Sequence, residues 1–71
     1  MKKLDVAYGD NELIESIILL DEDYNQIDSM EYDKDKDFLE SINEFLSEND
    51  LTIWEVDIEE EIIELLPSVF N

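Results

Sequence analysis

Apolar and polar residues alternate at the start of the chain, over residues 3–8. A period of two predicts a β-strand with one apolar face, here formed by Leu4, Val6 and Tyr8. Residues 9–11 follow with the sequence Gly-Asp-Asn, which is typical of a turn and contains the only glycine of the chain. The sequence therefore predicts a short strand that ends in a tight turn.

Residues 12–22 contain the longest apolar run, from Ile17 to Leu20, and their pattern fits two structures. The apolar positions fit one face of a helix, and they equally fit a strand that is buried on both faces. We favour the strand because β-branched isoleucine is concentrated there and because residues 24–26 fit a hairpin turn. The returning strand, over residues 27–32, has irregularly spaced apolar residues, which predicts a bulge or an irregular edge.

The clearest helix of the sequence covers residues 33–49, where five apolar residues recur on one helical face. They are Phe38, Leu39, Ile42, Phe45 and Leu46. Asp33, Asp35 and Asp37 lie before or within its first turn, where aspartate accepts hydrogen bonds from free backbone N–H groups. We therefore interpret at least one of these three aspartates as a helix cap.

The last third of the chain alternates again and then ends in a short apolar pattern. Residues 51–58 predict a strand with Trp54, Val56 and Ile58 directed inward. The glutamates at residues 59–61 favour the start of a last helix, because acids are stabilised there by the helix dipole. This helix is expected to end at Pro67. Its apolar residues, and those expected to fold back onto the core, are Ile62, Ile63, Leu65, Leu66, Val69 and Phe70.

These elements combine into a single domain over residues 1–71 with an α+β fold in the order β-β-β-α-β-α. We expect a small antiparallel sheet packed against one main amphipathic helix, with a short C-terminal helix. A chain of 71 residues buries only a small core. We therefore also predict a homodimer, because a second copy adds buried surface.

Charge changes this picture more than any other property. The chain has 22 acidic and 4 basic residues, for a net charge of −18, although its 44% hydrophobic content is that of a folded protein. Solubility requires a net charge of only about 2–8 on a small domain, and the excess destabilises the fold by self-repulsion. A functional display of charge explains the excess better than a merely solvated or salt-adapted surface. Such a polyanion excludes direct binding to nucleic acid or to anionic membranes, and it favours a basic protein partner.

The residue types that are missing argue against catalysis. The chain has no histidine and no cysteine, which excludes the commonest general base, the thiol nucleophile and most zinc sites. Residues 21–32 begin like a calcium-binding loop, but Gln26 and Tyr32 occupy positions that need glycine and glutamate. We expect no enzyme, no cofactor and no metal site. The absence of disulfides and of a long apolar run fits a protein of the cytoplasm.

Arrays of carboxylates on regular elements can replace the phosphates of DNA. Alternate residues of a strand lie ~6.6 Å apart, and phosphates advance ~3.4 Å per nucleotide, so the two spacings are of comparable scale. We predict that the partner-binding carboxylates of the hairpin and of the main helix are Asp21, Glu22, Asp23, Asp28, Glu31, Glu40 and Glu44. The target would be a DNA-binding protein, and its basic cleft would attract this acidic chain electrostatically, so that the chain inhibits DNA binding.

The stretch Glu15-Ser16-Ile17 resembles the E-S-I strand of the uracil-DNA glycosylase inhibitor of Bacillus phages. Residues 16–58 are similar in pattern to the small dimeric glycosylase inhibitors of short-tailed Bacillus phages. These resemblances imply a DNA mimic whose apolar pocket captures the side chain that the glycosylase wedges into DNA. They imply cleft contacts by Glu15, Ser16 and Ile17, and a helix site that contains Phe38 and Glu40.

Two other classes share the same acidity and stay open at this point. One is an inhibitor of a CRISPR effector or a restriction enzyme, which would be a DNA mimic with another target. The other is an acidic immunity protein or antitoxin that neutralises a basic toxin. For a phage-encoded inhibitor of any of these targets we expect the cytoplasm of the host cell as its location.

Overall fold

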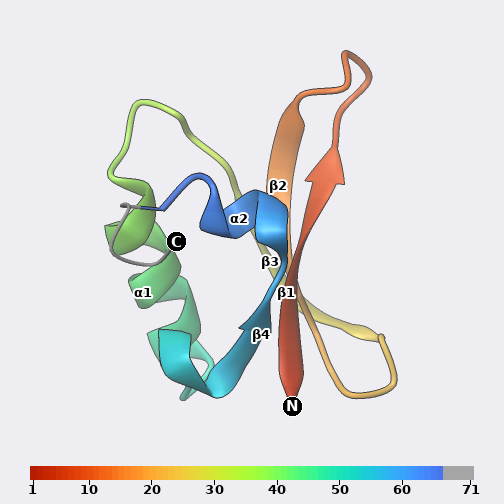
Figure 1. Ribbon diagram of the computed structural model, residues 1–71, viewed down its shortest axis with the longest axis vertical. Helices are drawn as coiled ribbons and strands as arrows, with labels where there is room; N and C mark the ends of the chain where they lie inside the picture. The colour runs from red at the N-terminus through yellow and green to blue at the C-terminus, as the bar shows by residue number, and fades with distance from the viewer. Residues whose placement is uncertain (67–71) are drawn as a thin grey trace.

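Four strands form one sheet in a computed structural model that describes residues 1–66 (Figure 1). In chain order the elements are β1 (Lys2–Tyr8), β2 (Ile14–Leu20), β3 (Gln26–Glu31), α1 (Phe38–Glu48), the 3₁₀ turn η1 (Ile53–Glu55), β4 (Val56–Ile58) and α2 (Glu60–Ile63). The expected α+β fold and its element order are confirmed. The predictions for Pro67, Val69 and Phe70 lie outside the described residues.

The strands are ordered β3-β2-β1-β4, and the sheet is mixed rather than purely antiparallel. β1, β2 and β3 pair antiparallel as expected, but β4 pairs parallel with β1, with Leu4 opposite Ile58. The reason lies in the path of the chain. α1 carries it from the end of β3 back to the end of the sheet at which β1 begins, so β4 runs in the direction of β1 (Figure 1).

The ambiguous segment over residues 12–22 contains a strand, β2, rather than a helix. β2 pairs with a neighbour on each side, and Ile17 and Leu19 are fully buried on the face that carries the core. The turn after it covers residues 21–25 rather than the predicted 24–26, because β2 ends at Leu20 and Gln26 already belongs to β3. The expected irregularity is present as a shift of register in the β2–β3 pairing beside Leu20.

The hydrophobic core lies between one face of the sheet and the two helices. Leu4 and Leu19 face each other across β1 and β2, and both are fully buried. In α1, the apolar stripe places Ile42, Phe45 and Leu46 in the core, and Asp37 caps the helix. The largest fully buried side chains are Leu4, Ile17, Leu19, Ile42, Leu46 and Ile62. The predicted stripe of the main helix is therefore confirmed, but the helix begins at Phe38 and not at residue 33, because Asp37 is its N-cap.

The segment before β4 differs from the prediction, which placed Trp54 on the inner side of a long strand. Thr52 and Glu55 form a capping box, in which the Glu55 carboxylate accepts a hydrogen bond from the Thr52 N–H at 3.1 Å. This arrangement closes a 3₁₀ turn and turns the Trp54 side chain outward, where it is 76% exposed. In α2 and the three residues after it, Ile62 and Leu66 are buried as predicted, whereas Leu65 is 37% exposed.

Candidate functional site

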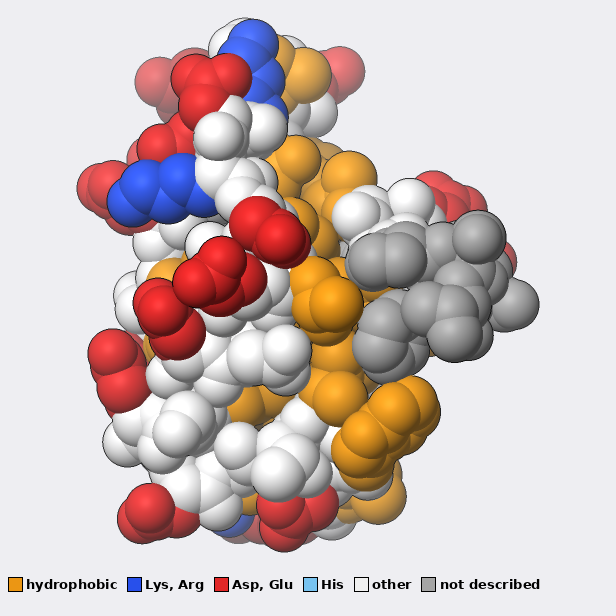
Figure 2. Space-filling view, turned by 90° about the vertical axis from the view of Figure 1, so that its left-hand side faces the viewer, with side chains coloured by type: hydrophobic (Ala, Val, Ile, Leu, Met, Phe, Trp, Pro, Cys, Tyr) orange, Lys and Arg blue, Asp and Glu red, His pale blue; other side chains and the backbone are white. Residues whose placement is uncertain are grey.

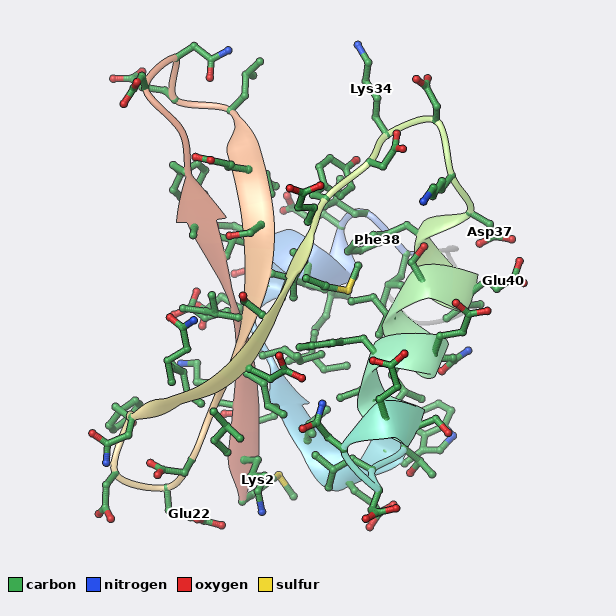
Figure 3. The ribbon with its side chains drawn as sticks, turned by 180° about the vertical axis from the view of Figure 1, so that it is seen from behind. Lys2, Glu22, Lys34, Asp37, Phe38 and Glu40 are labelled. Atoms are coloured by element: carbon green, nitrogen blue, oxygen red, sulfur yellow. The ribbon has the colours of Figure 1, made fainter. Side chains whose placement is uncertain are left out.

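The exposed side of α1 carries a continuous row of acidic residues. Glu40, Glu44 and Glu48 are all exposed and lie four residues apart, which is about 6 Å along a helix. Asp37 precedes them at the N-cap. Figure 3 shows Asp37 and Glu40 pointing away from the sheet, whereas Phe38 points toward it. The periodicity that buries one side of α1 therefore sets the acidic row on the other.

Two further acidic residues approach this row from the sheet side. Glu31 at the end of β3 and Asp33 in the following loop share a groove with Glu44 and Glu48 of α1. The groove has a volume of about 270 Å³, and Phe45 contributes to its apolar lining. We call the surface formed by these six carboxylates the acidic face: Glu31, Asp33, Asp37, Glu40, Glu44 and Glu48. Figure 2 shows acidic side chains spread over the side of the molecule on which α1 lies.

The acidic face is not neutralised by the rest of the described chain. Residues 1–66 contain two ion pairs, the N-terminal amine with Glu22 at 3.4 Å and Lys3 with Glu59 at 2.9 Å. Neither pair involves the acidic face. Lys36 lines the groove without forming an ion pair within that part of the chain. The face therefore presents almost its full charge to a partner.

Asp37 serves both the helix and the acidic face, and two substitutions separate these roles. Its carboxylate accepts a hydrogen bond from the Glu40 N–H at 3.2 Å, so Asp37→Ala is expected to destabilise the fold by about 1 kcal/mol. Asp37→Asn keeps an acceptor at the cap and removes only the charge. Urea unfolding should therefore show a larger loss of stability for Asp37→Ala than for Asp37→Asn. Equal losses of stability in both variants would show that the cap hydrogen bond does not cause the destabilisation.

The stretch Glu15-Ser16-Ile17 does not form the exposed strand that the resemblance implied. Ile17 is fully buried, so its predicted contact with a partner is wrong. β2 also pairs with β1 and β3 on its two sides, which leaves this strand no free edge for insertion into a cleft. Glu15 is exposed and Ser16 is half-buried beside Glu31, but they lie apart from the α1 row.

The acids of the β2–β3 turn have local roles that the sequence interpretation did not assign. The Asp21 carboxylate accepts hydrogen bonds from the Asn25 N–H at 2.9 Å and the Asp23 N–H at 2.8 Å. These bonds hold the pKa of Asp21 below its ordinary value. A hydrogen bond from its own backbone N–H, together with the N-terminal amine, lowers the pKa of Glu22. Asp23 is exposed, and the turn is at the opposite end of β3 from Glu31.

The turn gives a pH-dependent prediction. Because the pKa of Asp21 is lowered on folding, its ionised form stabilises the native state above its ordinary pKa of 3.8, and this contribution disappears as the pH falls through the lowered value. Asp21→Ala is therefore expected to lower the unfolding midpoint at pH 7 and to have a smaller effect near pH 2. Thermal unfolding of both proteins checks this, and a difference that is independent of pH would contradict it.

Two more predicted contact residues are engaged inside the fold. The Asp28 carboxylate accepts hydrogen bonds from the Ser29 N–H at 2.8 Å and from the Asn49 side chain at 3.1 Å. It thereby links β3 to the C-terminal end of α1. The half-buried Phe38 ring packs edge-on against Tyr32, with centroids 5.3 Å apart. Both residues therefore have structural roles that were not predicted from the sequence, and both remain partly exposed.

A second hollow, which the sequence did not indicate, lies between the β1–β2 turn and the loop before α1. It has a volume of about 710 Å³, and Tyr8, Leu13, Ile14 and Tyr32 form its apolar lining. Leu13 is 65% exposed although it is a large apolar residue. Leu13 is an apolar residue within a polar turn sequence, and this unusual feature did not by itself indicate a hollow.

Tyr8 connects this hollow to α2. Its hydroxyl donates a hydrogen bond to the Glu61 carboxylate, and this bond raises the pKa of Tyr8. Similarly, pairing with Glu59 raises the pKa of Lys3. The C-terminal acids are thus partly used to attach α2 to β1. They contribute less free charge to a partner than the row on α1.

Within residues 1–66, no group of three or more acidic side chains is placed to hold a metal ion. In the same part of the chain, no helix combines the length and the apolar character needed to cross a membrane. Comparisons with protein families, curated proteins and solved structures found no match to this chain.

Proposed function

We propose that this protein is a DNA-mimic inhibitor that occupies the DNA-binding cleft of a basic host protein in the cytoplasm. The observation that carries the proposal is the unneutralised acidic row on α1, continued toward β3 by Glu31 and Asp33. Regular spacing at about 6 Å suits a cleft whose lysine and arginine residues are placed for successive phosphates. Uracil-DNA glycosylase is the first target that we name.

The rigid attachment of the row to the core supports this mechanism. Ile42, Phe45 and Leu46 fix one side of α1 against the sheet, so the backbone positions that carry the glutamates are fixed before binding. A preorganised backbone loses little conformational freedom on association. The large negative charge also accelerates encounter with a basic cleft, and this acceleration falls with added salt. The protein itself would catalyse no reaction in this role.

The named target is tested by uracil excision. Purified protein at micromolar concentration and low salt is expected to inhibit uracil-DNA glycosylase on a uracil-containing duplex, and excess DNA is expected to relieve the inhibition. Unchanged excision under these conditions would rule out this target. A heat-unfolded sample of the same protein controls for inhibition by unstructured polyanion.

Association of two copies into a homodimer is a separate prediction, and it is tested by the mass of the protein in solution. Burial of apolar surface between two copies would add stability to a small core, and it would have to overcome the repulsion between two acidic chains. Sedimentation equilibrium at high protein concentration and moderate salt is therefore expected to give the mass of two chains. A single-chain mass over the whole concentration range would contradict the prediction.

A further inference from the structure

The hollow between the β1–β2 turn and the loop before α1 combines an apolar lining with an acidic rim. Tyr8 at the end of β1, Ile14 at the start of β2 and Tyr32 after β3 bring its walls together, and the exposed Leu13 stands beside them. Its volume of about 710 Å³ is within the usual range for a binding pocket. The hollow is continuous with the acidic face, because Glu31 and Asp33 line both.

The charges around the hollow are strongly unbalanced. Glu12, Glu31, Asp33 and Asp35 line it, and Lys34 is the only basic residue among its lining. Within residues 1–66, the carboxylates of Glu12, Glu31 and Asp35 accept no hydrogen bond and form no ion pair; Asp33 accepts one from the Asp35 N–H at 2.9 Å. Three carboxylates are therefore available to a ligand.

We propose that this hollow binds an arginine side chain presented by the basic surface of the partner protein. The inference rests on the proposed function and adds the chemistry of the anchoring residue. The aliphatic part of arginine can cover Leu13 and Ile14, and its planar guanidinium can stack on a tyrosine ring. The five N–H donors of the guanidinium match a rim of several carboxylates in a way that one point charge does not.

The acidic rim selects against an uncharged apolar occupant. A leucine-like side chain would fill the hollow and remove water from Glu12, Glu31 and Asp35 without offering them a donor. Loss of hydration without a replacement hydrogen bond is unfavourable for carboxylates. A lysine offers the charge, but it cannot pair with a carboxylate through two parallel hydrogen bonds. The combination of apolar walls and several acids thus fits arginine best.

The test is an NMR titration of the full-length, isotope-labelled protein with four capped tripeptides at constant ionic strength. Their central residues are arginine, lysine, citrulline and norleucine, so that charge, shape and apolarity are separated. The arginine peptide is expected to shift the signals of Leu13, Ile14 and Tyr32 with saturation. The citrulline peptide should bind about tenfold more weakly, because the charge-assisted hydrogen bonds are lost.

Matched variants locate the effect. Glu31→Gln and Leu13→Ser are each expected to weaken binding of the arginine peptide several-fold. Asp50→Asn, just after the C-terminal end of α1, changes the net charge as much as Glu31→Gln and is expected to leave this binding unchanged. The proposal is overturned if norleucine binds as well as arginine, or if the arginine peptide only produces non-saturating shifts spread over all acidic residues. Because no partner protein is present, these outcomes are independent of whether uracil-DNA glycosylase is inhibited.

Discussion

Replacing Glu40, Glu44 and Glu48 together by glutamine is expected to weaken partner binding strongly while making the free protein more stable. The three carboxylates form the exposed row of α1, and no basic residue among residues 1–66 forms an ion pair with them. Loss of charges that face a basic cleft should lower affinity by about 10²–10³-fold at low salt. Removal of two like-charge i,i+4 pairs should stabilise the helix by a few tenths of a kcal/mol per pair, roughly.

The control for this variant carries the same change in charge elsewhere. Glu60→Gln and Glu64→Gln in and after α2, combined with Asp50→Asn, also remove three negative charges from exposed positions. Binding measured by titration calorimetry should be nearly unchanged in this control, and urea unfolding should show no gain in α1 stability. Equal loss of binding in both triple variants would mean that total charge, and not the row on α1, determines recognition.

The Ile17→Ala variant is expected to unfold most of the protein at low salt. Ile17 is fully buried in the centre of the sheet, where it is paired with Val6 and Met30 on the neighbouring strands. Truncation of a buried isoleucine costs about 2–5 kcal/mol, which is comparable to the whole stability of a domain this small. Circular dichroism in a urea series measures the loss, and molar salt should restore part of the folding because it screens self-repulsion.

The neighbouring residue provides the matched comparison for Ile17. Ile18→Ala removes the same atoms on the same strand, but Ile18 is only half-buried, so a smaller loss of stability is expected. If Ile17→Ala instead stays as stable as the wild type and loses only partner binding, Ile17 would be a contact residue. The corrected assignment of the Glu15-Ser16-Ile17 stretch would then fail.

Local periodicity was sufficient to predict most of the fold. The alternation in β1 and the apolar stripe of α1 specify which side of each element is buried, because burial of that side is the main driving force for packing. The direction of β4 depends on where α1 returns the chain, which no local pattern specifies. The outward position of Trp54 was predictable in principle, since Thr52 and Glu55 have the spacing of a capping box.

The candidate site also contains parts that local sequence patterns predict and parts that they do not. The row of Glu40 and Glu44 follows from helical spacing, and it was predicted. The local role of Asp21 was not predicted, because the tendency of aspartate to accept hydrogen bonds within its own turn was not considered. The second hollow joins Leu13 to Tyr32 through the pairing of β2 with β3. Such a contact depends on the assembled sheet, so the chain pattern alone does not reveal it.

Elution by DNA tests the mimicry most directly. Wild-type protein, the triple variant of α1 and the control triple variant are immobilised and exposed to host lysate at low salt, and the retained proteins are challenged with duplex DNA at fixed ionic strength. The proposed function predicts that a DNA-binding protein is retained by the wild type and by the control, is not retained by the α1 variant, and is released by DNA. Retention that persists in saturating DNA, or equal retention by the α1 variant, would contradict the proposal.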